Sequence, residues 1–299
     1  MAAKPIIFSL FNDEPFSDVI CQKTGCELGK CTIHEFPDRE TLVRIETNVK
    51  NRPVVLLASL DNPNSKIAPL IFAIETLRDA GASQVGLITP YLAYMRQDKA
   101  FHTGEAVTSQ YFAKLLSSYL DWIITIAPHL HRWHDLNQVF SIPSTVLYAS
   151  PNIANWIKRH AKQPVLIGPD MESRQWVAEI AKRCDAPYLI GGKKRTGDET
   201  VTSTISQLKL YPNHTPIVID DIVSTGMTML ETIKHVQSYS TKDIICIGVH
   251  ALFSKNAYQA LLQTGISKLV TCNTILHPTN EIDLSNIIIE EIVSFYHLI

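Results

Sequence analysis

The feature that most constrains the fold is a series of short apolar runs separated by segments with helical periodicity. Because the runs are apolar on both faces, they are typical of central strands in a parallel sheet that helices cover on each side. Segments 67–81 and 228–239 carry apolar residues at three- and four-residue steps, as amphipathic helices do. The pattern predicts an α/β fold with mostly parallel sheets. The expected strands are 53–59, 84–90, 121–128, 164–169, 186–192, 216–222, 243–250 and 268–274.

The two halves of the chain repeat one order of elements, which indicates two tandem α/β domains. In each half, an expected helix leads into an expected strand and then into a polar segment. We expect a boundary near Tyr148, giving an N-terminal domain over 1–148 and a C-terminal domain over 149–284. The C-terminal tail, about 285–299, is a candidate to complete the first domain.

Composition and charge exclude several classes of function. The formal net charge of −2 offers no basic surface for nucleic acid or for a membrane. The sequence contains no 18-residue apolar run, and its first residues lack the pattern of a signal peptide, so we expect a cytoplasmic protein. The six cysteines show no CxxC spacing and are expected to be reduced thiols.

The strongest chemical signal is the segment IVIDDIVSTGMTM at 217–229. A loop that opens a helix offers free backbone N–H groups and the positive end of the helix dipole, which suit a phosphate. Carboxylates repel phosphate but accept hydrogen bonds from the vicinal hydroxyls of a ribose. The segment therefore predicts a phosphoribosyl site, with an ordinary acidic turn before a capped helix as the alternative. Its residues are Asp220, Asp221, Ser224, Thr225, Gly226 and Thr228.

This segment resembles the phosphoribosyl-pyrophosphate signature of the phosphoribosyltransferase fold. Further segments, in register over roughly residues 6 to 295, resemble the ribose-phosphate pyrophosphokinase family: FPDRE (36–40), PYLAYMRQDKAF (90–101), IAPHLH (126–131), GPDMES (168–173) and GKKRTGDETV (192–201). The resemblance implies two tandem phosphoribosyltransferase-like domains and an enzyme of nucleotide biosynthesis. That enzyme would transfer the β,γ-diphosphoryl group of Mg-ATP to O1 of ribose 5-phosphate, releasing phosphoribosyl pyrophosphate and AMP. Mg²⁺ is the implied cofactor, ATP and ribose 5-phosphate are the implied substrates, and a homo-oligomer is expected.

The resemblance also implies an ATP site. Phe36 would stack on adenine, and Asp38 and Glu40 would accept from its exocyclic amine. The remaining ATP residues would be Arg96, Gln97, Asp98, Lys99 and His129. His129 and Asp170 are the implied metal contacts, whereas we expect His131 and His134 to be structural or solvent-facing.

The loop at 193–200 is cationic at its start. Lys193 and Arg195 match the catalytic pair of the family, with Lys194 a weaker candidate between them. Fixed cations can stabilise the charge that develops on the β,γ oxygens during transfer. In isolation, such a run would most often be solvated surface charge.

The chain departs from the family pattern at three positions. Ala127 and Ser224 stand where many members carry Asp, and Met227 stands where Gly is common. Two rival interpretations remain. A phosphoribosyltransferase would explain 217–229 alone, and a non-catalytic regulatory relative would be expected to lose the loop cations.

Overall fold

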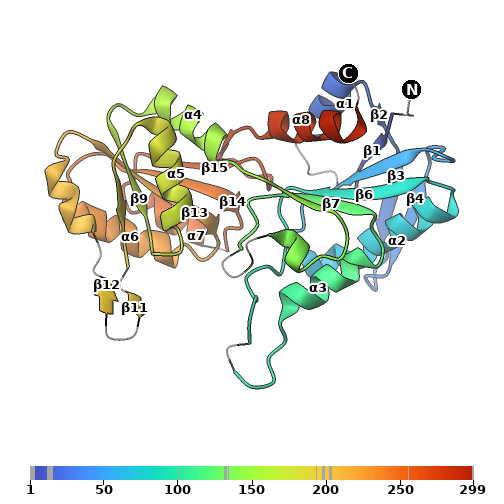
Figure 1. Ribbon diagram of the computed structural model, residues 1–299, viewed down its shortest axis with the longest axis horizontal. Coiled ribbons are helices and arrows are strands. Elements are labelled where there is room, and N and C mark those ends of the chain that lie inside the picture. The colour runs from blue at the N-terminus through green and yellow to red at the C-terminus, as the bar shows by residue number, and fades with distance from the viewer. Residues whose placement is uncertain are drawn as a thin grey trace. The chain divides into compact units, whose positions relative to one another are not determined.

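The computed structural model describes residues 4–11, 16–100, 102–130, 133, 135–192, 194–196, 199–201, 204–254 and 256–297; for 194–196 and 199–201 it describes the backbone alone. The chain forms two compact units. Unit 1 comprises Met1–Leu147, Thr274–Leu276 and Ser285–Ile299, and unit 2 comprises Tyr148–Asn273 and His277–Leu284. Each unit is built around its own sheet (Figure 1).

The main sheet of unit 1 has six parallel strands in the order β2-β1-β5-β6-β7-β8. The central strands β5 to β7 are almost wholly buried, as their apolar sequences predict. The strand bounds are β1 Ile6–Ser9, β2 Glu27–Leu28, β5 Pro53–Leu57, β6 Gln84–Thr89, β7 Trp122–Ile126 and β8 Ser144–Leu147.

Helices and a separate hairpin complete unit 1. The helices are α1 Ser17–Thr24, α2 Ile67–Asp79, α3 Thr108–Ser117 and α8 Ser285–Tyr296, with short 3-10 turns η1 Pro63–Ser65 and η2 Leu136–Gln138. The C-terminal helix α8 packs beside α1, and the ring of Phe295 lies 4.8 Å from that of Trp122 on β7. The antiparallel strands β3 (Cys31–Glu35) and β4 (Thr41–Ile45) form a hairpin that pairs with no further strand among the described residues.

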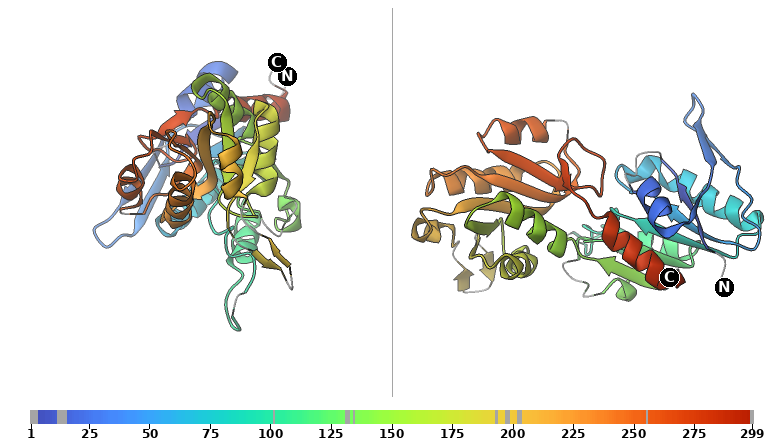
Figure 2. Two further views of the ribbon diagram at one scale, coloured as in Figure 1. Left: turned by 90° about the vertical axis from the view of Figure 1, so that its left-hand side faces the viewer. Right: turned by 90° about the horizontal axis from the view of Figure 1, so that it is seen from above.

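Unit 2 contains a second six-stranded parallel sheet, in the order β10-β9-β13-β14-β15-β16. Helices α4 and α5 cover one face and α6 and α7 the other (Figure 2). The strands are β9 Pro164–Gly168, β10 Tyr188–Ile190, β13 Thr215–Val223, β14 Ile245–Ala251, β15 Lys268–Cys272 and β16 Asn280–Ile282. The remaining elements are α4 Ser150–His160, α5 Arg174–Cys184, η3 Ile205–Leu210, α6 Met227–Gln237, α7 Ala257–Leu262 and the hairpin β11 Lys194–Thr196 with β12 Glu199–Val201.

The predicted fold class is confirmed: both main sheets are parallel and carry helices. Every expected strand coincides with an observed one, and the two expected helices are α2 and α6. Periodicity missed the short strands β1, β2, β8 and β16 and both hairpins. Within the described segments, no helix is long and apolar enough to cross a membrane.

Candidate active site

The acid pair lies on β13, at the carboxyl end of the sheet of unit 2. The strand continues to Val223, so Asp220 and Asp221 lie within its last four residues, as in the expected strand 216–222. The backbone N–H of Asp221 donates to Oδ1 of Asp220 at 3.0 Å. Burial, and then the negative charges of Asp221 and Asp170, raise the pKa of Asp220 well above its ordinary value. The carboxylates therefore lie close enough to repel one another, and a bound cation or hydroxyl donors would relieve that repulsion.

Asp170 belongs to the loop that follows the neighbouring strand β9. Its Oδ1 accepts from the backbone N–H groups of Glu172 at 2.9 Å and Ser173 at 3.0 Å. The hydroxyl of Ser173 donates to the carbonyl of Asp170 at 2.6 Å. Because β9 and β13 are adjacent and parallel, their loops leave the sheet at the same edge. The fold thus brings Asp170 to the acid pair.

The predicted phosphate loop joins β13 to α6. Gly226 has a φ of +72°, a conformation that side chains disfavour, and an added Cβ would lie 3.4 Å from Leu261. Its carbonyl accepts from the N–H of Leu230 at 2.8 Å, and the carbonyl of Ser224 accepts from Ser254 at 3.0 Å. Thr225 and Thr228 are exposed. An eleven-residue helix therefore begins beside accessible hydroxyls, an arrangement suited to an anion.

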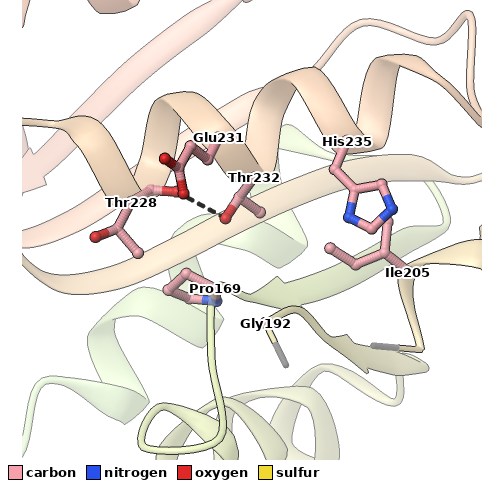
Figure 3. Close-up of a pocket in the computed structure, with 7 residues that line it drawn as sticks. All are labelled: Pro169, Gly192, Ile205, Thr228, Glu231, Thr232 and His235. Carbon is pink, nitrogen blue, oxygen red and sulfur yellow. Dashed lines mark hydrogen bonds between the residues drawn. The ribbon is translucent and has the colours of Figure 1, made fainter. Parts of the chain in front are cut away.

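A pocket of about 270 Å³ lies beside this loop (Figure 3). Thr228 comes from the start of α6, Pro169 precedes Asp170, and Gly192 precedes the cationic loop. The full lining is Pro169, Gly192, Ile205, Thr228, Glu231, Thr232 and His235. The three chain segments that carry the predicted ribose-phosphate and transfer residues therefore meet around one cavity.

Sequence reasoning did not single out Glu231, Thr232 or His235. Their spacing from Thr228, at three, four and seven residues, places all of them on one face of α6, and that spacing was the available signal.

The root of the cationic loop is close to Asp170. Gly192 has a φ of +71°, and an added Cβ would lie 3.5 Å from both Cα and Cβ of Asp170. Lys193 lies outside the described residues. Arg195 is on β11, where its backbone pairs with Thr200, and Lys194 pairs with Val201.

In unit 1, the second group of predicted residues follows two adjacent parallel strands, β6 and β7. Arg96, Gln97, Asp98 and Lys99 lie between β6 and α3, where Gln97 Nε2 donates to the carbonyl of Lys99 at 3.1 Å. His129 is partly buried and follows β7. Ala127, two residues before it, has a φ of +40° and donates its N–H to the carbonyl of Leu147 at 2.9 Å. His131 and His134 lie outside the described residues.

The adenine residues proposed for FPDRE form the tip of the β3–β4 hairpin. The N–H of Phe36 donates to Glu40 at 2.8 Å, and that of Glu40 to Oδ1 of Asp38 at 3.1 Å. Phe36 is 41% exposed, with its ring edge-on to His34. The hairpin and the segment between β6 and α3 extend from different sides of unit 1 (Figures 1 and 2). One chain therefore does not bring the two predicted parts of the ATP site together.

The cysteines contribute no chemistry to these segments. All six lie in described parts of the chain as free thiols. Burial is the main cause that raises the pKa of Cys21 and of Cys31 to about 11, so both are protonated at neutral pH.

Comparison with known proteins identifies the family. Residues 5–119 match the model of the N-terminal domain of ribose phosphate pyrophosphokinase, and residues 144–285 match the phosphoribosyl transferase domain. The ribose-phosphate pyrophosphokinase of Sulfurisphaera tokodaii is 30% identical over 88% of this chain and 89% of its own length. That of Sulfolobus acidocaldarius is 31% identical over 84% and 87%. The chain belongs to the ribose-phosphate pyrophosphokinase family.

The family assignment confirms the predicted enzyme class, a transferase of nucleotide biosynthesis. A solved phosphoribosylpyrophosphate synthetase from Mycobacterium smegmatis matches 98% of this chain and 99% of its own, with a TM-score of 0.84 and 20% identity. At that identity the likeness supports the fold, two phosphoribosyltransferase-like domains in tandem.

The family implies a magnesium ion, and the residues of unit 2 fit one. Within the described segments, no group of three or more His, Cys, Asp or Glu side chains is arranged to hold a metal unaided. Mg²⁺ is usually bound by one or two carboxylates together with waters and substrate phosphates. Asp170, held in place by two backbone N–H groups beside the crowded acid pair, meets that requirement.

Proposed function

We propose that the chain transfers the β,γ-diphosphoryl group of Mg-ATP to O1 of ribose 5-phosphate, releasing AMP. The observation that carries the proposal is the meeting of three segments in unit 2: the acid pair with its phosphate loop, the Asp170 loop and the root of the cationic loop.

In this proposal the ribose 5-phosphate lies across the start of α6. Its phosphate accepts from the backbone N–H groups of the loop and from the hydroxyls of Ser224, Thr225 and Thr228. Gly226 allows the backbone to approach the anion. The 2- and 3-hydroxyls donate to Asp220 and Asp221, which explains why two acids stand beside a phosphate site.

Asp170 would hold the magnesium ion together with phosphate oxygens, and His129 is proposed as a contact on the ATP side. The ion supplies positive charge to the transferring phosphates when it is bound. Lys193 and Arg195 would stabilise the charge that develops on the β,γ oxygens as O1 bonds to the β-phosphorus and AMP leaves.

For ATP we propose two groups of contacts. Arg96, Gln97, Asp98, Lys99 and His129 would bind the ribose and phosphates, and Phe36, Asp38 and Glu40 would bind adenine. Since the hairpin tip lies on another side of unit 1, both groups could contact one nucleotide only if a second copy supplied the hairpin (Figures 1 and 2). A homo-oligomer is therefore part of the proposal, as is a cytoplasmic location.

The test is AMP release from ATP, Mg²⁺ and ribose 5-phosphate with no nucleobase present. AMP and phosphoribosyl pyrophosphate should form in equal amounts, and neither should form when ribose 5-phosphate is omitted. A phosphoribosyltransferase would instead consume phosphoribosyl pyrophosphate once a base is added. A non-catalytic relative would bind the substrates and release no AMP.

A further inference from the structure

The two ends of the cationic loop are joined by hydrogen bonds of a single residue, Thr204. Thr204, just before η3, faces Ile190, the last residue of β10. The N–H of Thr204 donates to the carbonyl of Ile190 at 2.8 Å. Its Oγ1 accepts from the N–H of Ile190 at 2.8 Å and also lies 3.3 Å from the Ile190 carbonyl, to which it can donate. Both main-chain polar groups of Ile190 are therefore bound to the residue at the far end of the loop.

The position of Ile190 in the sheet explains why it needs these bonds. β10 is the edge strand of its sheet and pairs only with β9 in the described structure. Polar backbone groups on an open edge need other partners or solvent. Thr204 takes the place of a neighbouring strand at the point where the loop begins.

Each end of the closed loop is also attached to the site. The N–H of Gly191 donates to Gly168 at 2.7 Å, and an added Cβ on Gly191 would lie 2.6 Å from the carbonyl of Pro169. At the other end, Ile205 is 1% exposed and belongs to the hydrophobic core of unit 2. Gly192 and Ile205 both line the pocket beside α6 (Figure 3). The hydrogen bonds of Thr204 therefore join a segment fixed to the Asp170 loop to a residue fixed in the core.

We propose that Thr204 is a positioning residue for the diphosphoryl transfer. It acts through Ile190 by fixing the starting point of the backbone that carries Lys193 and Arg195. The inference rests on the function proposed above. A cation stabilises a transition state only when it is held in place beforehand, and a misplacement of about 1 Å can cost about 10²-fold in rate. Loss of the hydroxyl should therefore lower kcat. The KM for ribose 5-phosphate should change little, because the contacts proposed for that substrate lie on other segments.

The experiment compares Thr204→Val, Thr204→Ser and Thr215→Val. Thr215 is a matched control, because its hydroxyl also bonds a backbone carbonyl of unit 2, that of Lys162 at 3.1 Å, at the other end of β13. We expect Thr204→Val to lower kcat by roughly 10-fold or more, with the KM for ribose 5-phosphate within about 2-fold of wild type. Thr204→Ser should recover most of kcat, and Thr215→Val should keep it. If Thr204→Val fails to fold, Thr204→Ala, which also lacks the hydroxyl and has a smaller side chain, takes its place.

A second measurement does not depend on activity. Trypsin cleavage after Lys193, Lys194 and Arg195 should be faster in Thr204→Val than in Thr215→Val or wild type. Wild-type kcat with unchanged cleavage in Thr204→Val, or equal losses of kcat in both valine variants, would overturn the positioning role. A wild-type protein that releases no AMP, but whose loop is cleaved faster in Thr204→Val, would overturn the proposed function and keep the structural role of the closure.

Discussion

The backbone N–H of Asp221 donates to Oδ1 of Asp220, so two consecutive acids share a hydrogen bond at the edge of the candidate site. Burial and the charges of Asp221 and Asp170 raise the pKa of Asp220. The folded state therefore holds a proton on Asp220 more tightly than the unfolded chain does. As pH rises from about 4, the ordinary pKa of Asp, through the raised folded value, wild-type stability should fall.

Asp220→Asn should accordingly raise the free energy of unfolding at pH 8. It should also weaken the binding of ribose 5-phosphate more than the binding of ATP. If folding raises the pKa of Asp220 by one, the wild-type free energy of unfolding at high pH falls by about 1.4 kcal/mol. The stability that the variant gains over wild type should shrink as the pH falls toward 4. Urea unfolding at pH 5 and pH 8 measures the effect, with the exposed Asp243→Asn as control. A variant less stable than wild type at pH 8 would contradict this reading of the acid pair.

Lys193→Ala and Arg195→Ala should each lower kcat far more than they raise the KM for either substrate. Removal of one preorganised donor typically costs about 10²-fold or more in kcat. Steady-state kinetics with both substrates varied would measure the split. Lys182→Ala, which removes an exposed cation from α5 in the same unit, is the control and should leave kcat unchanged. Near wild-type kcat in both loop variants would mean that other groups stabilise the transferring phosphates.

Gly226→Ala should weaken ribose 5-phosphate binding and also destabilise the protein. An L side chain in the left-handed region costs about 1–2 kcal/mol. Gly265→Ala supplies a matched control: its φ is +79°, and nothing lies within 4 Å of an added Cβ. Both variants should therefore lose similar stability, whereas only Gly226→Ala should raise the dissociation constant for ribose 5-phosphate, measured by calorimetry. If Gly226→Ala and Gly265→Ala bind ribose 5-phosphate with equal affinity, the phosphate of the substrate does not bind at this loop.

Ala127→Asp should lower the concentration of Mg²⁺ that gives half-maximal activity, with the KM for ribose 5-phosphate nearly unchanged. A carboxylate before His129 could orient that imidazole or hold a metal-bound water. The backbone favours the change, since the φ of +40° at Ala127 is one that Asp adopts more readily than Ala. Ala127→Asn is equally suited to that backbone and lacks the charge. If both variants shift the Mg²⁺ titration alike, backbone relief and not the carboxylate is responsible.

The central strands could be predicted because burial on both faces leaves continuous apolar runs such as PVVLL at β5. The β3–β4 hairpin could not, since its residues are half-buried or exposed and its tip turns at Arg39, with a φ of +71°, without a glycine. Periodicity also carries no signal for the return of Thr274–Leu276 to unit 1.

The same distinction holds for the candidate site. Asp220 through Thr228 form one continuous stretch, so the residue types expected to bind a ribose and a phosphate can be recognised from the sequence alone. The closure of Ile190 by Thr204 joins residues fourteen positions apart, and the pocket joins α6 to two loops from other strands. These contacts form only once the strands have assembled in the order of the folded sheet, so the sequence alone does not predict them.

The place of α8 has a consequence for synthesis. The residues of α8 leave the ribosome after both main sheets have been made, yet they pack on α1 and on Trp122, in the unit whose sheet is made first. Unit 1 therefore cannot complete its core until α8 has been made, and until then the side of β7 that carries Trp122 stays uncovered. Unit 2 needs nothing beyond Leu284, so the half of the protein synthesised second can finish folding first.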